Sequence, residues 1–162
     1  MVVVPSYGTS TALASGSLNG LADDAFWISE RIDFSGSGFL PVFTQIHVAI
    51  QTTVTAGSSN GLAKVFLAEG LTTAGLSGGA GSTQGVFAGL PTDSEAAENM
   101  LLMGIIKAPA EDTVSHNFAI DLLLPSFITP KFGSVVVQNF TGAALSTAGN
   151  SVEIAAHQVL NS

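Results

Sequence analysis

Two segments near the end of the chain alternate between two kinds of side chain, and this constrains the fold most. In 131–140 one face would carry Phe132, Ser134, Val136, Gln138 and Phe140, and the other Val135, Val137 and Asn139. In 150–160, Val152, Ile154 and Ala156 oppose Glu153, Ala155 and His157. A linker of Thr, Gly, Ala, Ser and Asn joins the two segments. Because successive strand side chains leave opposite faces, the pattern predicts a closing β-hairpin.

The same alternation recurs upstream. The segment 39–55 is the longest example: Ile46, Val48 and Ile50 share one face, and Gln45, His47 and Gln51 share the other. In 114–124 a second apolar face would hold Val114, His116, Phe118, Ile120, Leu122 and Leu124. Further strands are expected at 26–34, 62–69 and 100–107. About seven or eight strands with almost no helix signal predict an all-β protein, an antiparallel β-sandwich of jelly-roll type.

Two segments do not fit a regular strand pattern. Residues 1–21 hold Pro, Gly, Ser and Thr with few apolar anchors, which indicates an extended N-terminal arm ahead of a sandwich domain at 22–162. Residues 70–99 are rich in Gly, Ser and Thr and are expected to form a long excursion from the sandwich. In 26–34, Phe26 and Ile28 are inward candidates. Trp27 would then lie on the other side, at an interface or under a loop.

Composition favours association. The chain is 46% hydrophobic and 10% charged, with a net charge of −8, whereas an ordinary domain has about 25% charged residues. We expect part of the exterior to be covered by copies of the chain or by another protein; a compact monomer with a Ser/Thr/Asn surface is the alternative. The candidate interface residues are Val2, Val3, Val4, Tyr7, Leu13, Leu18, Trp27, Phe87 and Leu90.

Several functional classes are disfavoured. The four cations, Arg31, Lys64, Lys107 and Lys131, are scattered, which argues against binding to nucleic acid or to an anionic membrane. The sequence has no cysteine, so disulfides and thiolate metal sites are excluded. Met1 to Val4 lacks a basic n-region and meets Pro5, so no secretory signal is expected, and the longest apolar runs are far shorter than the ~20 residues of a membrane span.

Chemistry-bearing motifs are absent from the sequence. His47, His116 and His157 fall on three predicted strands without metal-ligand spacing, so we predict no metal site; a pH-sensitive interface stays open. The acids Asp93, Glu95 and Glu98 lack the pattern of a calcium loop. There is no nucleophile elbow, phosphate-binding loop or H-E-x-x-H motif. We expect no catalytic residues, no cofactor and no enzyme activity, although paired carboxylates at glycosidase spacing stay open.

The closing segment carries a resemblance. Residues 130–145 read PKFGSVVVQNFTGAAL, and weaker echoes lie upstream in order: LNGLA at 18–22, ERID at 30–33 and NMLLMGII at 99–106. Together these motifs span nearly the whole chain. This set resembles small structural proteins of tailed-phage virions. Residues 70–99 and 127–131 depart from that family, and the N-x-T triplet at Asn139 is interpreted as a turn.

The resemblance implies a capsid decoration (cement) protein. Such proteins bind the outer capsid after its expansion, commonly as trimers at junctions between capsomers, with the major capsid protein and copies of the chain as partners. The implied location is the virion surface, after synthesis in the host cytoplasm. Two alternatives stay open: a tail, baseplate or fibre-base component, and a carbohydrate-binding sandwich module that would need exposed aromatics such as Trp27 and Tyr7.

Overall fold

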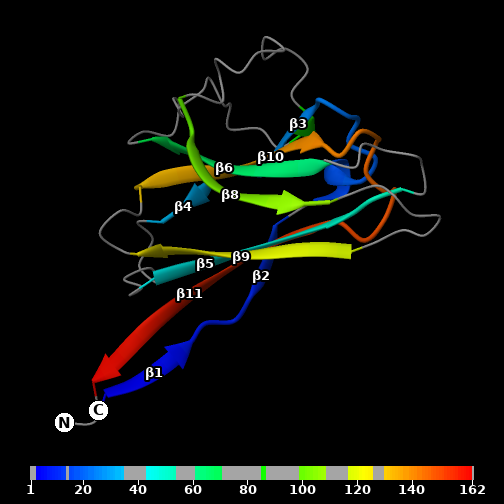
Figure 1. Cartoon of the computed structure of the whole chain (residues 1–162). Coiled ribbons are helices and arrows are strands. Elements are labelled where there is room, and N and C mark those ends of the chain that lie inside the picture. The colour runs from blue at the N-terminus through cyan, green and yellow to red at the C-terminus, as the bar shows by residue number, and fades with distance from the viewer. Residues whose placement is uncertain are drawn as a thin grey trace.

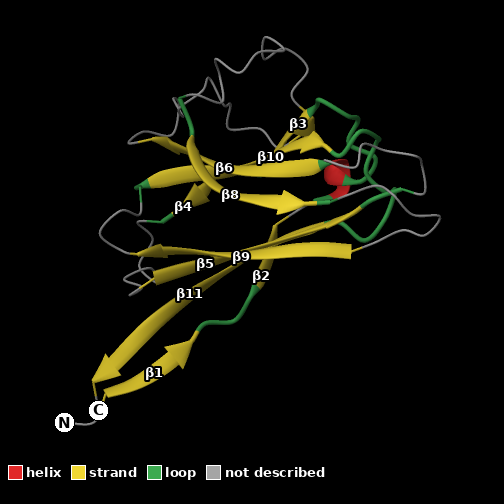
Figure 2. Cartoon of the chain, viewed as in Figure 1, coloured by secondary structure: helices red, strands yellow, loops and turns green. Residues whose placement is uncertain are grey.

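The computed structural model describes residues 3–13, 15–34, 43–53, 61–70, 85–86, 99–108, 117–125 and 130–161 (Figure 1). These residues form two antiparallel β-sheets that pack face to face (Figure 2). The helical part of the described chain is one short 3-10 turn, η1 (Gly16–Leu18). The all-β prediction and the β-sandwich are therefore confirmed.

The first sheet, sheet A, has five strands in the order β1-β11-β5-β9, with β2 also paired to β11. Its strands are β1 (Val3–Tyr7), β2 (Thr11–Leu13), β5 (Phe43–Gln51), β9 (Asn117–Pro125) and β11 (Ser151–Asn161). The second sheet, sheet B, has six strands in the order β7-β3-β10-β6-β8, with β4 also paired to β10. Its strands are β3 (Phe26–Ile28), β4 (Ile32–Asp33), β6 (Leu62–Gly70), β7 (Gly85–Val86), β8 (Leu101–Lys107) and β10 (Phe132–Phe140).

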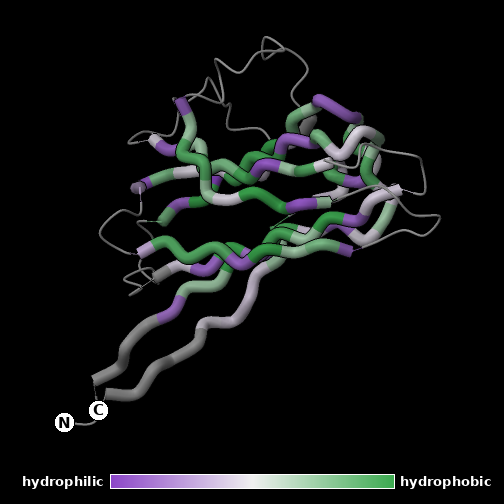
Figure 3. Tube along the Cα trace, in the orientation of Figure 1, coloured by the Kyte–Doolittle hydropathy of each residue, from purple (hydrophilic) through white to green (hydrophobic). Residues whose placement is uncertain are grey.

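The main hydrophobic core lies between the sheets. In β5 the side chains Ile46, Val48 and Ile50 are buried as predicted, and they face Val65 and Leu67 of β6 and other residues of sheet B within one cluster. In the body of the sandwich, green stretches recur along the strands of both sheets in the hydropathy view (Figure 3). Burial of alternate side chains explains why these segments form strands. Each buried side chain stabilises the fold by about 25 cal/mol for every Å² of apolar surface that it withdraws from water.

The two sheets differ on their outer faces. Sheet B carries a second buried apolar cluster on the side away from the main core: Phe26, Ile28, Phe66, Ala68, Met100, Phe132 and Val136. β10 is consequently buried along almost its whole length. The outer residues of β5, in contrast, are only half-buried, and several of those in β9 are exposed. Sheet A therefore has one buried face and one face open to solvent.

Trp27 lies in the main core, which corrects the expectation that it occupies an interface. Its side chain is fully buried, and Nε1 donates a hydrogen bond to Ser17 Oγ at 3.0 Å. Phe26 and Ile28, the predicted inward residues, lie instead in the outer cluster of sheet B. Because both faces of β3 are apolar and buried, alternation in three residues could not distinguish the inner face from the outer one.

The closing segments do not form a hairpin. β10 belongs to sheet B and β11 to sheet A, and each pairs with strands distant in the chain. Residues 141–150 between them cross one end of the sandwich. There Leu145 N donates to Leu21 O, Gly20 N donates to Ser146 O, and the Asn150 side chain bonds to Gln51 N and Asn19 Oδ1. The motifs at 18–22 and 130–145 thus meet and close this end.

Asn139 is the centre of that closure. Its side chain is fully buried; Nδ2 donates to the carbonyl oxygens of Leu21, Ala22 and Ala143 at 2.8–3.1 Å. Its Oδ1 accepts from the backbone N–H and the hydroxyl of Thr141. Asn139 and Phe140 are the last residues of β10, and the chain bends directly after them at 141–143, where the buried amide shapes the backbone.

The N-terminal segment is joined to the sandwich by strand pairing: β2 lies in its body, whereas β1 pairs with the end of β11 that extends beyond it. β1 and β2 both pair with β11, and Leu13, Leu18 and Leu21 are buried in the main core. A boundary after residue 21 therefore does not separate two structural units. Of the predicted excursion 70–99, only residues 70, 85–86 and 99 are described. His116 and the acids at 93–98 also lie outside the described residues.

Candidate functional site

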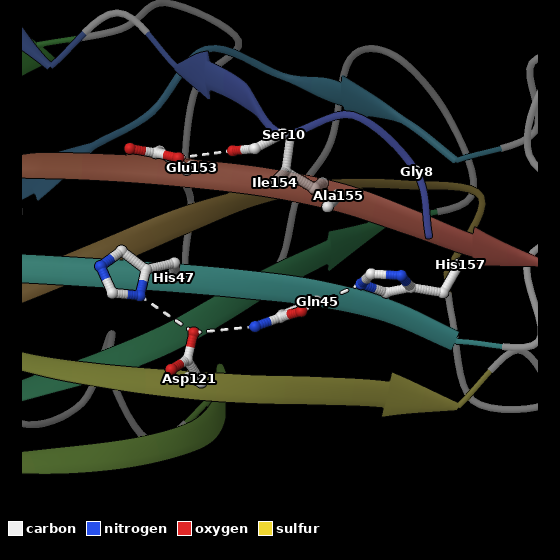
Figure 4. A pocket seen from close by; sticks show the side chains of 9 residues that line it. All are labelled: Gly8, Ser10, Gln45, His47, Asp121, Glu153, Ile154, Ala155 and His157. Carbon is white, nitrogen blue, oxygen red and sulfur yellow. Dashed lines mark hydrogen bonds and ion pairs between the residues drawn. The ribbon is translucent and has the colours of Figure 1, made fainter. Parts of the chain in front are cut away.

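The open face of sheet A contains a hollow with a volume of about 360 Å³. Three strands and the segment joining β1 to β2 form it (Figure 4). Its lining residues are Gly8, Ser10, Gln45, His47, Asp121, Glu153, Ile154, Ala155 and His157. Antiparallel pairing puts Glu153 opposite His47 and His47 opposite Asp121, so these three side chains form a row across β11, β5 and β9. Neighbouring strands lie about 4.8 Å apart, which keeps adjacent members of the row within contact distance.

A chain of hydrogen bonds links the polar side chains (Figure 4). His47 Nδ1 and Gln45 Nε2 each lie 2.9 Å from Asp121 Oδ1, and His157 Nε2 lies 2.9 Å from Gln45 Oε1. An ionised carboxylate and an amide oxygen only accept, so both histidine nitrogens in these contacts must donate. Asp121 Oδ1 therefore accepts two hydrogen bonds in this network, one from His47 and one from Gln45.

The segment that connects β1 and β2 approaches β11 very closely. A Cβ atom at Gly8 would clash with the backbone oxygen of Ala156, so glycine fits at this position without a shift of the backbone. Two residues further on, Ser10 Oγ donates to Glu153 Oε2. The close approach thus brings a hydroxyl onto the carboxylate at one end of the row.

Charge is unevenly divided between the sheets. The four cations of the chain all lie in or directly beside strands of sheet B: Arg31, Lys64, Lys107 and Lys131. The strands of sheet A contain Asp121 and Glu153 and no lysine or arginine. His47 and Asp121 are 37% and 57% exposed, so water screens their ion pair, and such surface pairs stabilise a fold by only about 0–1 kcal/mol. The hollow therefore offers acceptors and negative charge to a partner and contributes little to folding.

The hollow presents several polar side chains in one place, and its geometry can be compared with three kinds of site. Among the described residues, no group of three or more histidine or carboxylate side chains is placed to hold a metal ion. The hydroxyl nearest the row, Ser10 Oγ, donates to the carboxylate of Glu153 and not to a histidine, so it does not form a Ser–His pair. None of the lining residues is a Trp, Tyr or Phe that could stack on a sugar.

The hydrogen bonds to Asp121 should be visible in its titration. The bond from His47 and then that from Gln45 hold the pKa of Asp121 below its ordinary value of 3.8. The folded-state pKa is lower than the unfolded one, so ionised Asp121 stabilises the fold above pH 3.8, and this contribution is lost as the pH falls through the folded-state pKa. We expect the His47→Gln substitution to raise the pKa of Asp121, as measured by carboxyl ¹³C shifts in an NMR titration.

The control for this titration is Gln51→Ala, which changes another outer-face residue of β5 that does not contact Asp121. We expect the Asp121 titration to stay where it is in this variant. An unchanged Asp121 curve in His47→Gln would show that the His47 bond does not persist in solution.

The structure places the predicted interface residues in different environments. Leu13, Leu18 and Trp27 are buried in the core, so they are not available to a partner. Val3, Val4 and Tyr7 lie in β1. Val2, Phe87 and Leu90 lie outside the described residues.

The hollow was only partly visible in the sequence. Alternation correctly placed Gln45 and His47 on the open face of β5, and Glu153 and His157 on one face of β11. Ser10 and Asp121 were not candidates, because nothing local marks them as neighbours of β5. The signal that could have identified Asp121 is alternation: it lies between Ile120 and Leu122 of the predicted apolar face, so its side chain must point to the opposite face of the strand.

No protein-family model and no curated protein matches the chain. In the part of the chain that the structure describes, no helix has the length and hydropathy that crossing a bilayer requires.

Proposed function

We propose that this chain is a non-enzymatic structural protein of a phage virion, a decoration protein that binds the outer surface of the head and reinforces it. The sequence motifs introduced this proposal, and the fold supports it in two ways. Sheet A leaves a polar face open to a partner, and the hollow on it has the make-up of a binding surface. The major capsid protein and further copies of the chain are the proposed partners.

The jelly-roll type is part of the proposal. When β1 with β2 and β3 with β4 each count as one strand, and the two-residue β7 is set aside, eight strands remain. The first of these pairs with the eighth, the second with the seventh, the third with the sixth and the fourth with the fifth. Such nested pairing is expected when one long hairpin folds into two Greek keys, an arrangement used by viral capsid and lectin domains.

The observation that carries the proposal is a two-stranded ribbon that extends beyond the sandwich. Among the described residues, β11 pairs with β5 as far as His157, opposite Phe43, whereas its pairing with β1 continues to Asn161, opposite Val3. Figure 1 shows this ribbon leaving the body of the molecule, with both chain ends at its tip. A two-stranded ribbon alone in water is marginally stable at best, so it gains most by lying on another surface.

The structure disfavours the alternative of a carbohydrate-binding module, because the aromatic residue best suited to stack on a sugar is not exposed. Trp27 is fully buried, so it cannot form part of an exposed platform for sugar rings. The tail, baseplate or fibre-base alternative uses the same surfaces in a different part of the particle. Locating the protein in separated heads and tails of purified virions distinguishes these two positions.

Removing the ribbon tests the proposal. Deletion of residues 2–7 leaves Gly8, Ser10 and the core residue Leu13 in place, so we expect a small change in melting temperature. Attachment to expanded heads that lack the protein should weaken about tenfold or more, because every copy in a multivalent assembly loses the same contact. Co-sedimentation with heads measures attachment, and circular dichroism measures melting.

A matched variant keeps the chain length and replaces residues 2–6 by Gly and Ser, which lowers strand propensity without shortening the chain. It should attach as poorly as the deletion. Full attachment by both variants would contradict a role for the ribbon, and attachment to tails alone would favour the alternative location.

A further inference from the structure

β8 is an outermost strand of sheet B and is unusually apolar for such a position. In the described part of the chain it pairs only with β6, which leaves the backbone groups on its other side without a strand partner. Four large hydrophobic side chains are exposed among the described residues, and three of them lie on β8: Leu101, Leu102 and Ile105 at 39%, 48% and 46%. The fourth is Leu123, on β9.

Natural proteins usually protect such edges. β9, the corresponding outermost strand of sheet A, has a charge at Asp121 and ends at Pro125, both of which discourage pairing with another strand. β8 runs from Leu101 to Ile106 without a charge or a proline. Its one irregularity is a bulge, where Leu102 and Gly104 pair with consecutive residues of β6 and Met103 is the extra residue.

The sequence of β8 is complementary to itself. In an antiparallel register with its two-fold axis between Met103 and Gly104, Leu102 of one copy lies opposite Ile105 of the other. Leu102 and Ile105 pair with Phe66 and Lys64 of β6, which lie on the outer face of sheet B. Both residues of β8 therefore lie on that outer face as well. Leu101 likewise meets Ile106. The bulge then lies at the axis, where it does not displace the pairs on either side.

Charge does not oppose this register. Lys107, the one charged residue of β8, lies at the end of the strand and would stand well apart from Lys107 of the second copy. Opposed apolar pairs are favourable across antiparallel strands, whereas directly opposed like charges are not. A contact of this kind uses the same surface on both copies, as two-fold contacts do.

We propose that β8 pairs with β8 of a second copy in this register, which continues sheet B across a two-fold axis. The inference deepens the proposed function, on which it rests for its biological setting, by assigning the surface through which copies associate. It yields a dimer; a trimer, which the resemblance implies, would need a head-to-tail contact between two different surfaces.

The experiment measures mass by light scattering during gel filtration at micromolar concentration, using the full chain. The wild-type chain should have twice the monomer mass of 16.4 kDa. The two-fold axis produces two equivalent pairs of Leu102 with Ile105. A dimer of Ile105→Lys, or of Leu102→Glu, would place an uncompensated charge opposite an apolar residue in both pairs. Each substitution should weaken dimerisation about 100-fold or more, as expected for charges at a desolvated interface. Both positions are exposed in one copy, so folding should survive, and a melting curve of each variant verifies this.

The control is Leu123→Lys, an exposed leucine on the other outermost strand, which should leave the dimer intact. A mixture tests the register itself: Ile105→Lys with Leu102→Glu opposes lysine to glutamate at one pair and restores the original leucine and isoleucine at the other. We expect the mixture to regain the dimer mass although neither variant dimerises alone.

The inference is overturned by a wild-type monomer or trimer, by a dimer that persists in Ile105→Lys, by loss of the dimer in Leu123→Lys, or by a mixture that stays monomeric. No phage particle is involved, so these outcomes are independent of the attachment that the ribbon deletion measures.

Discussion

Replacing Asn139 with alanine should lower the free energy of unfolding by about 3–5 kcal/mol, since several buried polar groups lose their partners at about 1–3 kcal/mol each. The carbonyl oxygens of Leu21, Ala22 and Ala143 and the backbone N–H of Thr141 all bond to this side chain. For a chain of this length, the melting temperature should fall by roughly 10 °C or more. Thermal and urea unfolding followed by circular dichroism measure the change.

Two further variants isolate the cause. Asn139→Asp keeps the shape and one acceptor oxygen but removes both N–H donors, so a carboxylate faces three carbonyl oxygens; we expect it to be at least as unstable at neutral pH. Asn117→Ala changes an exposed asparagine in β9 and should stay within about 0.5 kcal/mol of the wild type. If Asn139→Ala were as stable as Asn117→Ala, the end closure would not depend on this amide.

Trp27→Ala should lower the free energy of unfolding by a comparable amount, about 3–5 kcal/mol, because it removes a large buried side chain and leaves a cavity. The indole is fully buried between the sheets, and its Nε1 donor is satisfied by Ser17. The oligomeric state of the folded variant should not change. Urea unfolding and light scattering of the same samples measure both properties.

A tryptophan at an interface and a tryptophan in the core predict opposite effects of Trp27→Ala on stability and association. An interface tryptophan would change association and leave the melting temperature of the single chain nearly unaltered. Ser17→Ala provides a matched control for the polar end of the indole, since loss of this one hydrogen bond should cost about 1 kcal/mol. A Trp27→Ala variant with wild-type stability and altered mass would place this side chain at an interface after all.

The closure at Asn139 also accounts for two of the four motifs that carry the resemblance to phage proteins, those at 18–22 and 130–145. Residues 18–22 and 130–145 are far apart in the chain, yet the structure brings them to one end of the sandwich, where Leu21 O accepts from both Asn139 Nδ2 and Leu145 N. These residues serve the fold. The surfaces proposed to bind partners, namely the hollow on sheet A, the ribbon and the edge of β8, are formed largely by other residues.

Several features followed from the sequence because they depend on neighbours along the chain. Alternation over many residues assigned β5 its buried and open faces correctly, since a strand must place successive side chains on opposite sides. The bend that follows Asn139 also agrees with local chemistry: Asn, Thr and Gly close together can bond to their own backbone.

The partners of each strand were decided only by the tertiary structure. Nothing local distinguishes a hairpin from two strands that enter different sheets, so β10 and β11 were wrongly expected to pair. Three apolar residues in β3 could not reveal that Trp27 faces the core, because both sides of that strand are buried. The row of Glu153, His47 and Asp121 depends on the register of three strands distant in sequence. Alternation determines which side chains share a face of one strand, whereas pairing and packing depend on the whole chain.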